Sequence, residues 1–396
     1  MIGFGVVSLA ADMVYEGARS VYGPLLASLG ASALAVGLIT GAGEAAALVL
    51  RLVSGPLADR TRRYWTLTIA GYALTAVCVP LLAVTPALGA AGLAVAVVLI
   101  VVERLGKAVR SPAKSALLAD AAGAVGMGRG MGVHQALDQV GAFAGPLLLA
   151  GLIVAAGGRL WPGLAVLAVP GLLAMVVLVV VRRRAVAVHP RPRAGAAAVG
   201  EPAEEARTRL PRLFWWFAVA CAVCTGGLMT FGLIGFHLAR AGVVPTAGVP
   251  LLYAAAMAAA AVAALATGAL YDRVGPRVLL VLPVLVAVVP ALAFSTSLAV
   301  AAGGVLVWGT ATGVQDSTVK AFVADLVSRQ RRATAYGIFA AVQGAGALIG
   351  GATAGTLYEA SLTWLLVVVA ATQAAAMLIL LTVLARRRTP DPSSPA

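Results

Sequence analysis

One strongly apolar stretch of the sequence contains five charged side chains. Residues 101–120 read VVERLGKAVRSPAKSALLAD and directly follow the apolar run LGAAGLAVAVVLI. The five are Glu103, Arg104, Lys107, Arg110 and Lys114. At 100° per residue, all except Arg104 share one face of a helix, and Arg104 is placed to reach a neighbouring helix. A charge at the centre of a bilayer costs roughly 2.5–3.5 kcal/mol on insertion scales, so these side chains must pair with one another or face water.

Three further apolar stretches contain charged residues at helical spacing. In each stretch the residues share one face of a helix. The sets are Asp12, Glu16 and Arg19 in the first, Glu44 and Arg51 in the second, and His134, Asp138, Gly141 and Gly145 in the third. Over the four stretches, five acids accompany six bases. This near balance indicates ion pairing inside a hydrated chamber rather than contact with lipid.

Carboxylates in such a chamber can carry protons. Burial favours the neutral form of a carboxyl group, and an approaching Arg or Lys favours the charged form. Suitable pairs are Glu103 with Lys107, Asp12 or Glu16 with Arg19, and Asp138 with Arg110. The candidate proton-coupling residues are therefore Asp12, Glu16, Glu44, Glu103 and Asp138, and we hypothesise that protonation of Asp12, Glu16 or Glu103 competes with substrate.

The second half of the chain is much poorer in interior charge. Asp316 and Lys320, at i and i+4, form its clear pair, and Gln315 and Gln343 add neutral polarity. The candidate substrate-binding residues are Arg19, Lys107, Arg110, Tyr15, Asp316, Lys320 and Gln343. A cytoplasmic gate is predicted from Arg51, Arg110, Lys114, His134 and Asp138.

The composition predicts an all-α membrane protein. Of 396 residues, 61% are hydrophobic and 11% are charged, whereas soluble domains are about 25% charged. Apolar runs of about 20 residues predict twelve transmembrane helices, the first of them uncleaved. Most Lys and Arg residues lie in segments that would face one side, so the positive-inside rule places both termini in the cytoplasm. The net charge of +14 therefore requires no nucleic-acid partner.

The two halves of the chain resemble each other. GPLADRTRRY (55–64) and GALYDRVGPR (268–277) share G-x-L-x-D-R, and ALLAD (116–120) matches AFVAD (321–325). Gly132, Gly141 and Gly145 fall opposite Gly337, Gly346 and Gly350 at one offset. We predict a six-helix bundle over 1–182, a cytoplasmic linker over 183–212, a second bundle over 213–386 and a disordered tail over 387–396, with a site between the bundles.

These features resemble the major facilitator superfamily of secondary transporters. The resemblance implies two pseudo-symmetric bundles, alternating access, a monomer and no cofactor. It implies that Asp59 binds the N-terminus of the eleventh helix, near residues 332–335, and so holds the cytoplasmic side closed. The sequence departs from the family's motif at Arg62, which replaces the second glycine. The predicted gating residues are Asp59, Arg60, Arg63, Arg51, Lys114, His134, Asp272 and Arg273.

The direction of transport rests on a short motif. GAFAGP (141–146) resembles the G-x-x-x-G-P of the superfamily's drug:proton antiporters and favours proton-coupled efflux of a small organic molecule. The partners are then substrate, protons and membrane lipids. The alternative is a carrier of a phosphate- or carboxylate-bearing anion on Lys107, Arg110 and Lys114.

A non-transporting receptor or scaffold is a third, weaker hypothesis. Catalytic motifs such as H-E-x-x-H and G-x-S-x-G are absent from the sequence, so neither an enzyme nor a metal site is predicted. Cys221 and Cys224 are interpreted as small buried hydrophobes. The abundance of Ala, Gly, Val and Arg is typical of a GC-rich bacterial genome and favours a bacterial inner membrane.

Overall fold

A computed structural model describes residues 2–123, 127–188, 210–327 and 331–386, and throughout these ranges the regular secondary structure is helical. The first half contains α1 (Ile2–Ser28), α2 (Ala33–Val49), α3 (Arg51–Thr61), α4 (Tyr64–Leu81), the 3₁₀ helix η1 (Leu82–Ala91), α5 (Gly92–Gly123), α6 (Met127–Ala155), α7 (Leu160–Val166) and α8 (Ala168–Val188). The second half contains α9 (Arg212–Leu228), α10 (Phe231–Arg240), α11 (Gly248–Val274), η3 (Gly275–Leu280), α12 (Val281–Ala293), α13 (Leu298–Leu326), α14 (Arg332–Ala360) and α15 (Leu362–Arg386). Residues 183–188, assigned to the linker by composition, continue α8.

Many of these helices are long and apolar enough to cross a bilayer. Within the described residues, nine helical stretches meet that criterion. Two of the nine, Tyr64–Leu118 with 55 residues and Gly248–Ala293 with 46, are each long enough to cross twice. The chain is therefore a multi-pass membrane protein built from helices, as its composition predicts.

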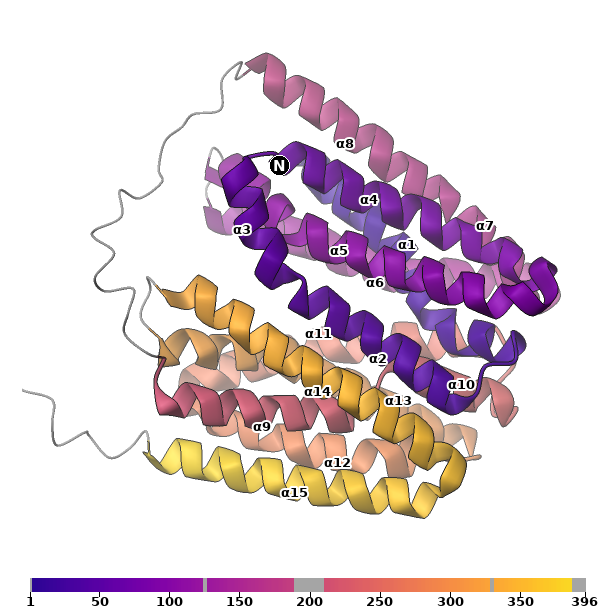
Figure 1. Cartoon of the computed structure of the whole chain (residues 1–396), viewed down its shortest axis with the longest axis vertical. Helices are drawn as coiled ribbons and strands as arrows, with labels where there is room; N and C mark the ends of the chain where they lie inside the picture. Colours follow the sequence, from indigo (N-terminus) through magenta and orange to yellow (C-terminus); the bar gives the residue numbers. More distant parts are fainter. Residues whose placement is uncertain (1, 124–126, 189–209, 328–330, 387–396) are drawn as a thin grey trace, which may run out of the picture.

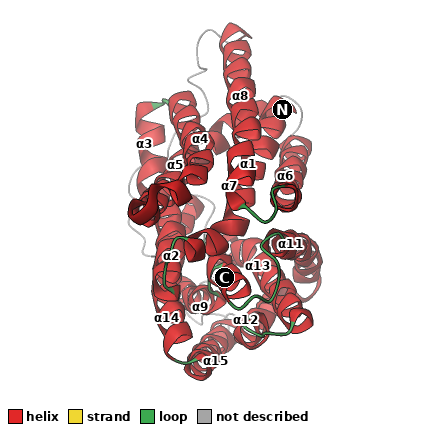
Figure 2. Ribbon diagram, turned by 90° about the vertical axis from the view of Figure 1, so that its right-hand side faces the viewer, coloured by secondary structure: helices red, strands yellow, loops and turns green. Residues whose placement is uncertain are grey.

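The helices form two groups that meet along a seam. Figure 1 shows the first half of the chain above and the second half below, and Figure 2 shows the same division after a quarter turn. At the seam α2 packs on α14 and α1 packs on α10. We call the end where α8 finishes and α9 begins the linker end, and the opposite end the far end.

Glycines make equivalent contacts in the two groups. A Cβ on Gly141 or Gly145 of α6 would lie 2.3 Å from a backbone oxygen of α1. A Cβ on Gly346 or Gly350 of α14 would lie 2.3 or 2.1 Å from a backbone oxygen of α9. The backbones can approach this closely only because side chains are absent there. The glycine pairs that match in sequence thus hold the same helix–helix contact in both halves.

One crossing is broken at membrane depth. Between α9 and α10, Met229 has a left-handed backbone (φ 44°), so the helix cannot continue through it. The indole N–H of Trp308 donates to the Met229 carbonyl at 3.1 Å, which satisfies an oxygen that the break releases.

The two copies of the G-x-L-x-D-R loop each end in a residue with positive φ. Arg62 closes α3 with φ 51°, and Gly275, its counterpart in the second half, has φ 70°. A left-handed conformation favours glycine, which explains why the family pattern has glycine at this place. Arg62 therefore adopts a left-handed backbone at a steric cost, whereas Gly275, whose ψ is −159° against 19° for Arg62, adopts its positive φ freely.

Candidate functional site

Arg104 is the most deeply buried cation among the described side chains of the first group. Its side chain is only 2% exposed, and its Nη1 lies 3.2 Å from Oε1 of Glu44 on α2. The same nitrogen donates to the hydroxyl of Tyr15 on α1, and Nε lies 3.7 Å from Oε2 of Glu103. Arg104 therefore reaches the neighbouring helices, as its position off the charged face predicts, and ties α5 to α1 and α2.

The contacts continue from Glu44 through Arg19 and Glu16 to the second group. Oε1 of Glu44 also lies 2.9 Å from Nη2 of Arg19, and Nη1 of Arg19 lies 3.6 Å from Oε2 of Glu16. Glu16 in turn accepts a hydrogen bond from the hydroxyl of Tyr253, on α11 of the second group. We call this set the central network: Tyr15, Glu16, Arg19, Glu44, Arg104 and Tyr253.

Lys107 lies beside the central network, and no carboxylate among the described side chains is in ion-pair contact with it. Its Nζ is 3.3 Å from the centre of the Tyr15 ring, a cation–π arrangement that stabilises the ammonium group. Tyr15 thus receives Arg104 on its hydroxyl and Lys107 on its ring. The predicted pair of Lys107 with Glu103 does not form, because Glu103 faces α4.

Two other charged side chains of α5, Glu103 and Arg110, turn toward α4. Glu103 is 1% exposed and accepts a hydrogen bond from Thr75 at 3.3 Å. Arg110 donates to the same hydroxyl at 3.2 Å, and its guanidinium lies over the Tyr72 ring at 4.2 Å. The predicted pair of Arg110 with Asp138 is therefore replaced by contacts with neutral groups of α4.

A second polar group lies closer to the linker end. Lys114 Nζ is 4.0 Å from Oδ1 of Asp138 and 3.4 Å from the hydroxyl of Ser8. Ser8 is in turn 3.5 Å from Nε2 of His134. The carboxyl groups of Asp12 on α1 and Asp138 on α6 are close enough to interact electrostatically. We call these residues the inner cluster: Ser8, Asp12, Lys114, His134 and Asp138.

The Asp12–Asp138 contact has a chemical consequence. An ionised carboxylate only accepts hydrogen bonds, so two carboxyl groups can hydrogen-bond to each other only when one carries a proton. Two like charges at this separation also disfavour double ionisation. The inner cluster can therefore hold one exchangeable proton between α1 and α6, next to the ammonium group of Lys114.

Comparison with known proteins identifies the family. The model of the Major Facilitator Superfamily matches residues 4–294 and 242–396 of the sequence. The chain belongs to the major facilitator superfamily. It is 50% identical over 367 residues to an uncharacterised protein of Mycobacterium tuberculosis, covering 92% of this chain and 88% of the relative. It is 25% identical over 372 residues to an uncharacterised transporter of this superfamily from Methanocaldococcus jannaschii, covering 90% and 88%.

Solved structures of the superfamily share the fold. A peptide-bound POT family transporter superposes with a TM-score of 0.75 at 12% identity, covering 98% of this chain and 96% of that one. A variant of the nucleoside transporter NupG gives 0.74 at 12% identity, covering 96% and 99%. The predicted superfamily is thus confirmed, and the chain is a transporter rather than an enzyme.

Among the residues predicted to gate the superfamily fold, Lys114 and His134 belong to the inner cluster, whereas the other six do not. Arg60, Arg63, Asp272 and Arg273 are exposed at the ends of α3 and α11. The side chain of Asp59 is outside the described residues, although α14 does begin at Arg332, within the range predicted for its partner helix. Arg51, at the start of α3, is half-buried and is not part of the inner cluster.

The second group contributes little charge to the described interior. Asp316 is exposed, and the side chain of its predicted partner Lys320 lies outside the described residues. Gln343 and Gln315 instead donate to one hydroxyl, that of Thr225 on α9, at 3.3 and 3.1 Å. Gln315, Gln343, Thr225 and Tyr253 thus give the second group neutral hydrogen-bonding side chains where the first group has charged ones.

Sequence reasoning missed the contacts that close the seam toward the far end. Ala33, Gly37, Gly41 and Ala45 form a stripe of small residues with period four on α2. A Cβ on Gly37 would lie 2.1 Å from the Gly351 oxygen of α14. At the far end, the N–H of Ala33 donates to Glu359 at 2.6 Å. The period-four stripe was readable in the sequence, but its partner helix was not.

Removal of the Glu359 carboxylate should loosen this closure. Glu359 of α14 binds the N-terminus of α2, where the helix dipole favours negative charge. We expect Glu359→Leu to cost the closed far end about 1 kcal/mol, a roughly fivefold change in the ratio of closed to open forms. Spin labels at positions 88 and 298, both exposed at the far end, would report this as a larger fraction of long distances.

Glu359→Gln is the matched control, because an amide oxygen can still accept from the Ala33 N–H. It should fall between the wild type and Glu359→Leu. Identical distance distributions for all three proteins would show that this contact does not hold the far end closed.

Proposed function

We propose that this chain is a proton-coupled antiporter that exports a small organic molecule across the bacterial inner membrane by alternating access. The proposal counts twelve crossings: nine apolar stretches, two of them counted twice because they contain two crossings each, and α1, which is 27 residues long. The basic linker and tail then lie in the cytoplasm. The far end faces outward, and the state described here is closed on that side.

The observation that carries proton coupling is the Asp12–Asp138 carboxyl pair. It joins α1 to α6, the helix whose GAFAGP sequence resembles the antiporter motif, and Lys114 lies 4.0 Å from one of its carboxylates. A movement of α5 that withdraws or advances Lys114 would change how readily the pair gives up its shared proton. Proton binding would thereby be linked to the conformation of the bundle.

The central network supplies the complementary link to substrate. The hydrogen bond from Tyr253 to Glu16 joins the two groups, and Arg19 and Glu44 continue it into α2. A substrate that offers a positive or hydrogen-bonding group to Glu16 would compete with Tyr253. Binding there would release a contact between the bundles, which is the event that alternating access requires.

Infrared spectroscopy tests the proton site without knowledge of the substrate. Near neutral pH, the purified protein should show a protonated-carboxyl band that Asp12→Asn and Asp138→Asn each remove. Glu44→Gln is the matched control: Glu44 is paired with two arginines and should remain ionised, so the band should persist. A wild-type spectrum without this band would refute the shared proton.

Transport by the intact protein tests the coupling. In proteoliposomes with an imposed pH gradient, movement of ethidium or a related lipophilic cation should follow the gradient. Asp138→Asn should abolish that dependence while leaving gradient-free exchange measurable. Transport that ignores the pH gradient in the wild type would exclude antiport.

The alternative of an organic-anion carrier has one feature in its favour, the position of Lys107. This ammonium group is held over the Tyr15 ring and could bind a phosphate or carboxylate. However, Arg110 turns to α4 and Lys114 to Asp138, so the three cations do not converge on one point. Competition by p-aminohippurate but not by ethidium would favour this alternative.

A further inference from the structure

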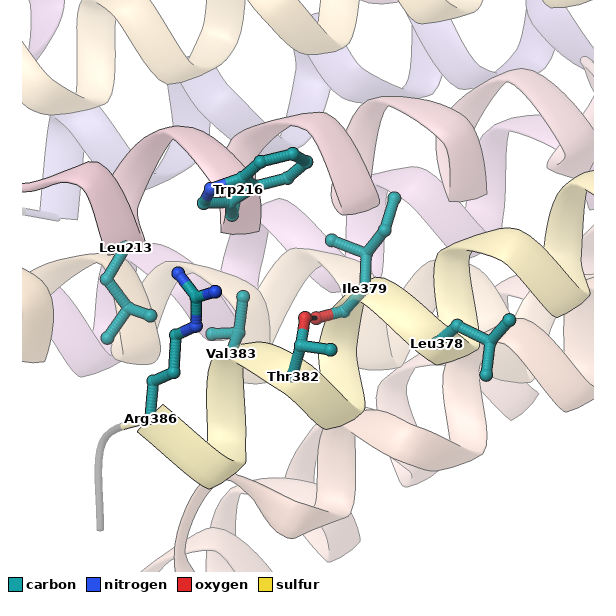
Figure 3. Close-up of a pocket in the computed structure, with 7 residues that line it drawn as sticks. All are labelled: Leu213, Trp216, Leu378, Ile379, Thr382, Val383 and Arg386. Atoms are coloured by element: carbon teal, nitrogen blue, oxygen red, sulfur yellow. Dashed lines mark hydrogen bonds between the residues drawn. The ribbon is translucent and has the colours of Figure 1, made fainter. Parts of the chain in front are cut away.

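A groove opens on the outer surface of the second group, away from the central network. It lies at the linker end between the first turns of α9 and the last turns of α15, and has a volume of about 300 Å³. Figure 3 shows its wall of Leu213, Trp216, Leu378, Ile379 and Val383, with Thr382 and Arg386 also on the lining. The groove is thus a strip of hydrocarbon surface that ends at a guanidinium group.

The polar groups of the groove are gathered at one end. The hydroxyl of Thr382 donates to the carbonyl of Ile379 within its own helix at 2.7 Å, so it presents mainly its methyl group. Arg386 reaches from the end of α15 toward Leu213 and Trp216 at the start of α9 (Figure 3). Leu378 lies eight residues earlier on α15, about 12 Å farther into the membrane.

The groove also lies at the depth where lipid headgroups begin. Trp215 and Trp216 are 45% and 51% exposed, and exposed tryptophans gather at the boundary between hydrocarbon and headgroups. Arginines gather around two helix ends in the sequence: Arg207 and Arg209 precede α9, which begins at Arg212, and Arg387 and Arg388 follow α15, which ends at Arg386. In the sequence, basic residues therefore gather at the two helix ends that border the groove.

We infer that this groove binds an anionic phospholipid of the leaflet at the linker end. One acyl chain lies along the wall between α9 and α15, and the headgroup phosphate meets Arg386 beside the indole of Trp216. A zwitterionic lipid offers the same acyl chain without net negative charge, so the site should prefer phosphatidylglycerol to phosphatidylcholine. Because α9 and α15 both belong to the second group, the lipid would brace that group near the end of the linker.

Native mass spectrometry of the full-length protein in detergent tests this site. With phosphatidylglycerol and phosphatidylcholine supplied equally, the wild type should retain more of the anionic lipid. An arginine near an anionic surface contributes about 1 kcal/mol, so Arg386→Gln should reduce phosphatidylglycerol retention about fivefold and leave phosphatidylcholine unchanged. Arg240→Gln, which removes an exposed arginine at the far end, should have no effect on either.

Two further arms separate a lipid site from a simple anion site and from unspecific adhesion of lipid to the protein. Thr382→Trp fills the groove from an exposed position without changing charge, and should reduce retention of both lipids. Excess inorganic phosphate should not displace phosphatidylglycerol, because it has no acyl chain. Three results would each overturn the assignment. The first is equal retention of the two lipids by the wild type, and the second is displacement of phosphatidylglycerol by phosphate. The third is that Arg386→Gln or Thr382→Trp, with a melting temperature equal to that of the wild type, retains as much phosphatidylglycerol as the wild type does.

Discussion

Replacement of Arg104 by leucine should lower the free energy of unfolding by about 3–5 kcal/mol, because it leaves a buried partner without its counter-charge. Glu103 is 1% exposed and would keep only the hydrogen bond from Thr75. Tyr15 would lose the donor to its hydroxyl, and α5 its contact with Glu44 on α2. The measurement is the midpoint of unfolding in mixed micelles of dodecyl maltoside and SDS.

Two further variants define what Arg104 contributes. Arg240→Leu removes an exposed arginine that lies over the Phe236 ring and should change stability by less than about 0.5 kcal/mol. The double variant Arg104→Leu with Glu103→Leu removes both buried charges and should recover part of the loss, since a matched apolar pair is often as stable as an ion pair. If Arg104→Leu were no more harmful than Arg240→Leu, the central network would not hold the first group together.

The sequence was sufficient to predict the helices, the repeat and the charged interior. Apolar runs have the length that a bilayer demands, and the structure places helices on them. The balance of acids and bases indicated pairing, and Glu44 does pair with Arg19 and Arg104. These features depend on composition and on spacing along a single helix, both of which are visible in a sequence.

The partners of individual side chains could not be predicted in the same way. Helical spacing shows that Glu103, Lys107, Arg110 and Lys114 share a face of α5, but α1, α4 and α6 all border that face. Glu103 and Arg110 turn to α4, Lys107 to α1, and Lys114 to α6, because each side chain contacts the helix nearest to its own level. The rotation and tilt of the neighbouring helices decide these partners.

Contacts between the two halves were the least predictable. Tyr253 is one of several aromatic residues in the second half, and nothing in its neighbourhood in the sequence distinguishes it as the donor to Glu16. Within the first half, the proximity of Asp12 and Asp138 likewise depends on the close approach of α1 and α6. Gly141 and Gly145 permit that approach, so the glycines were recognisable as packing residues, whereas the proximity of these two candidate residues to each other was not.

A bulky residue at position 37 should drive the far end open. A Cβ on Gly37 would lie 2.1 Å from the backbone oxygen of Gly351, and backbone cannot move aside as a flexible side chain can. Overpacking of this kind costs about 1–3 kcal/mol, which the protein can avoid by separating α2 from α14. Gly37→Leu should therefore shift the ratio of open to closed far ends by roughly 5- to 150-fold. The distance between spin labels at positions 88 and 298 should lengthen accordingly.

The shift should occur only when the replaced glycine lies in the contact between α2 and α14. A Cβ on Gly151, within α6, would meet no atom within 4 Å, so Gly151→Leu should leave the distance between the labels unchanged. Gly351→Leu, on the opposite side of the same contact, would place its Cβ 2.4 Å from the Gly37 oxygen and should reproduce the effect of Gly37→Leu. If the two seam variants behaved like Gly151→Leu, the far end would be held closed by contacts other than α2 on α14. If they opened it, the small-residue stripe would be the hinge surface on which the two groups of helices rock, and any substrate that favours the open form would bind these variants more tightly than the wild type.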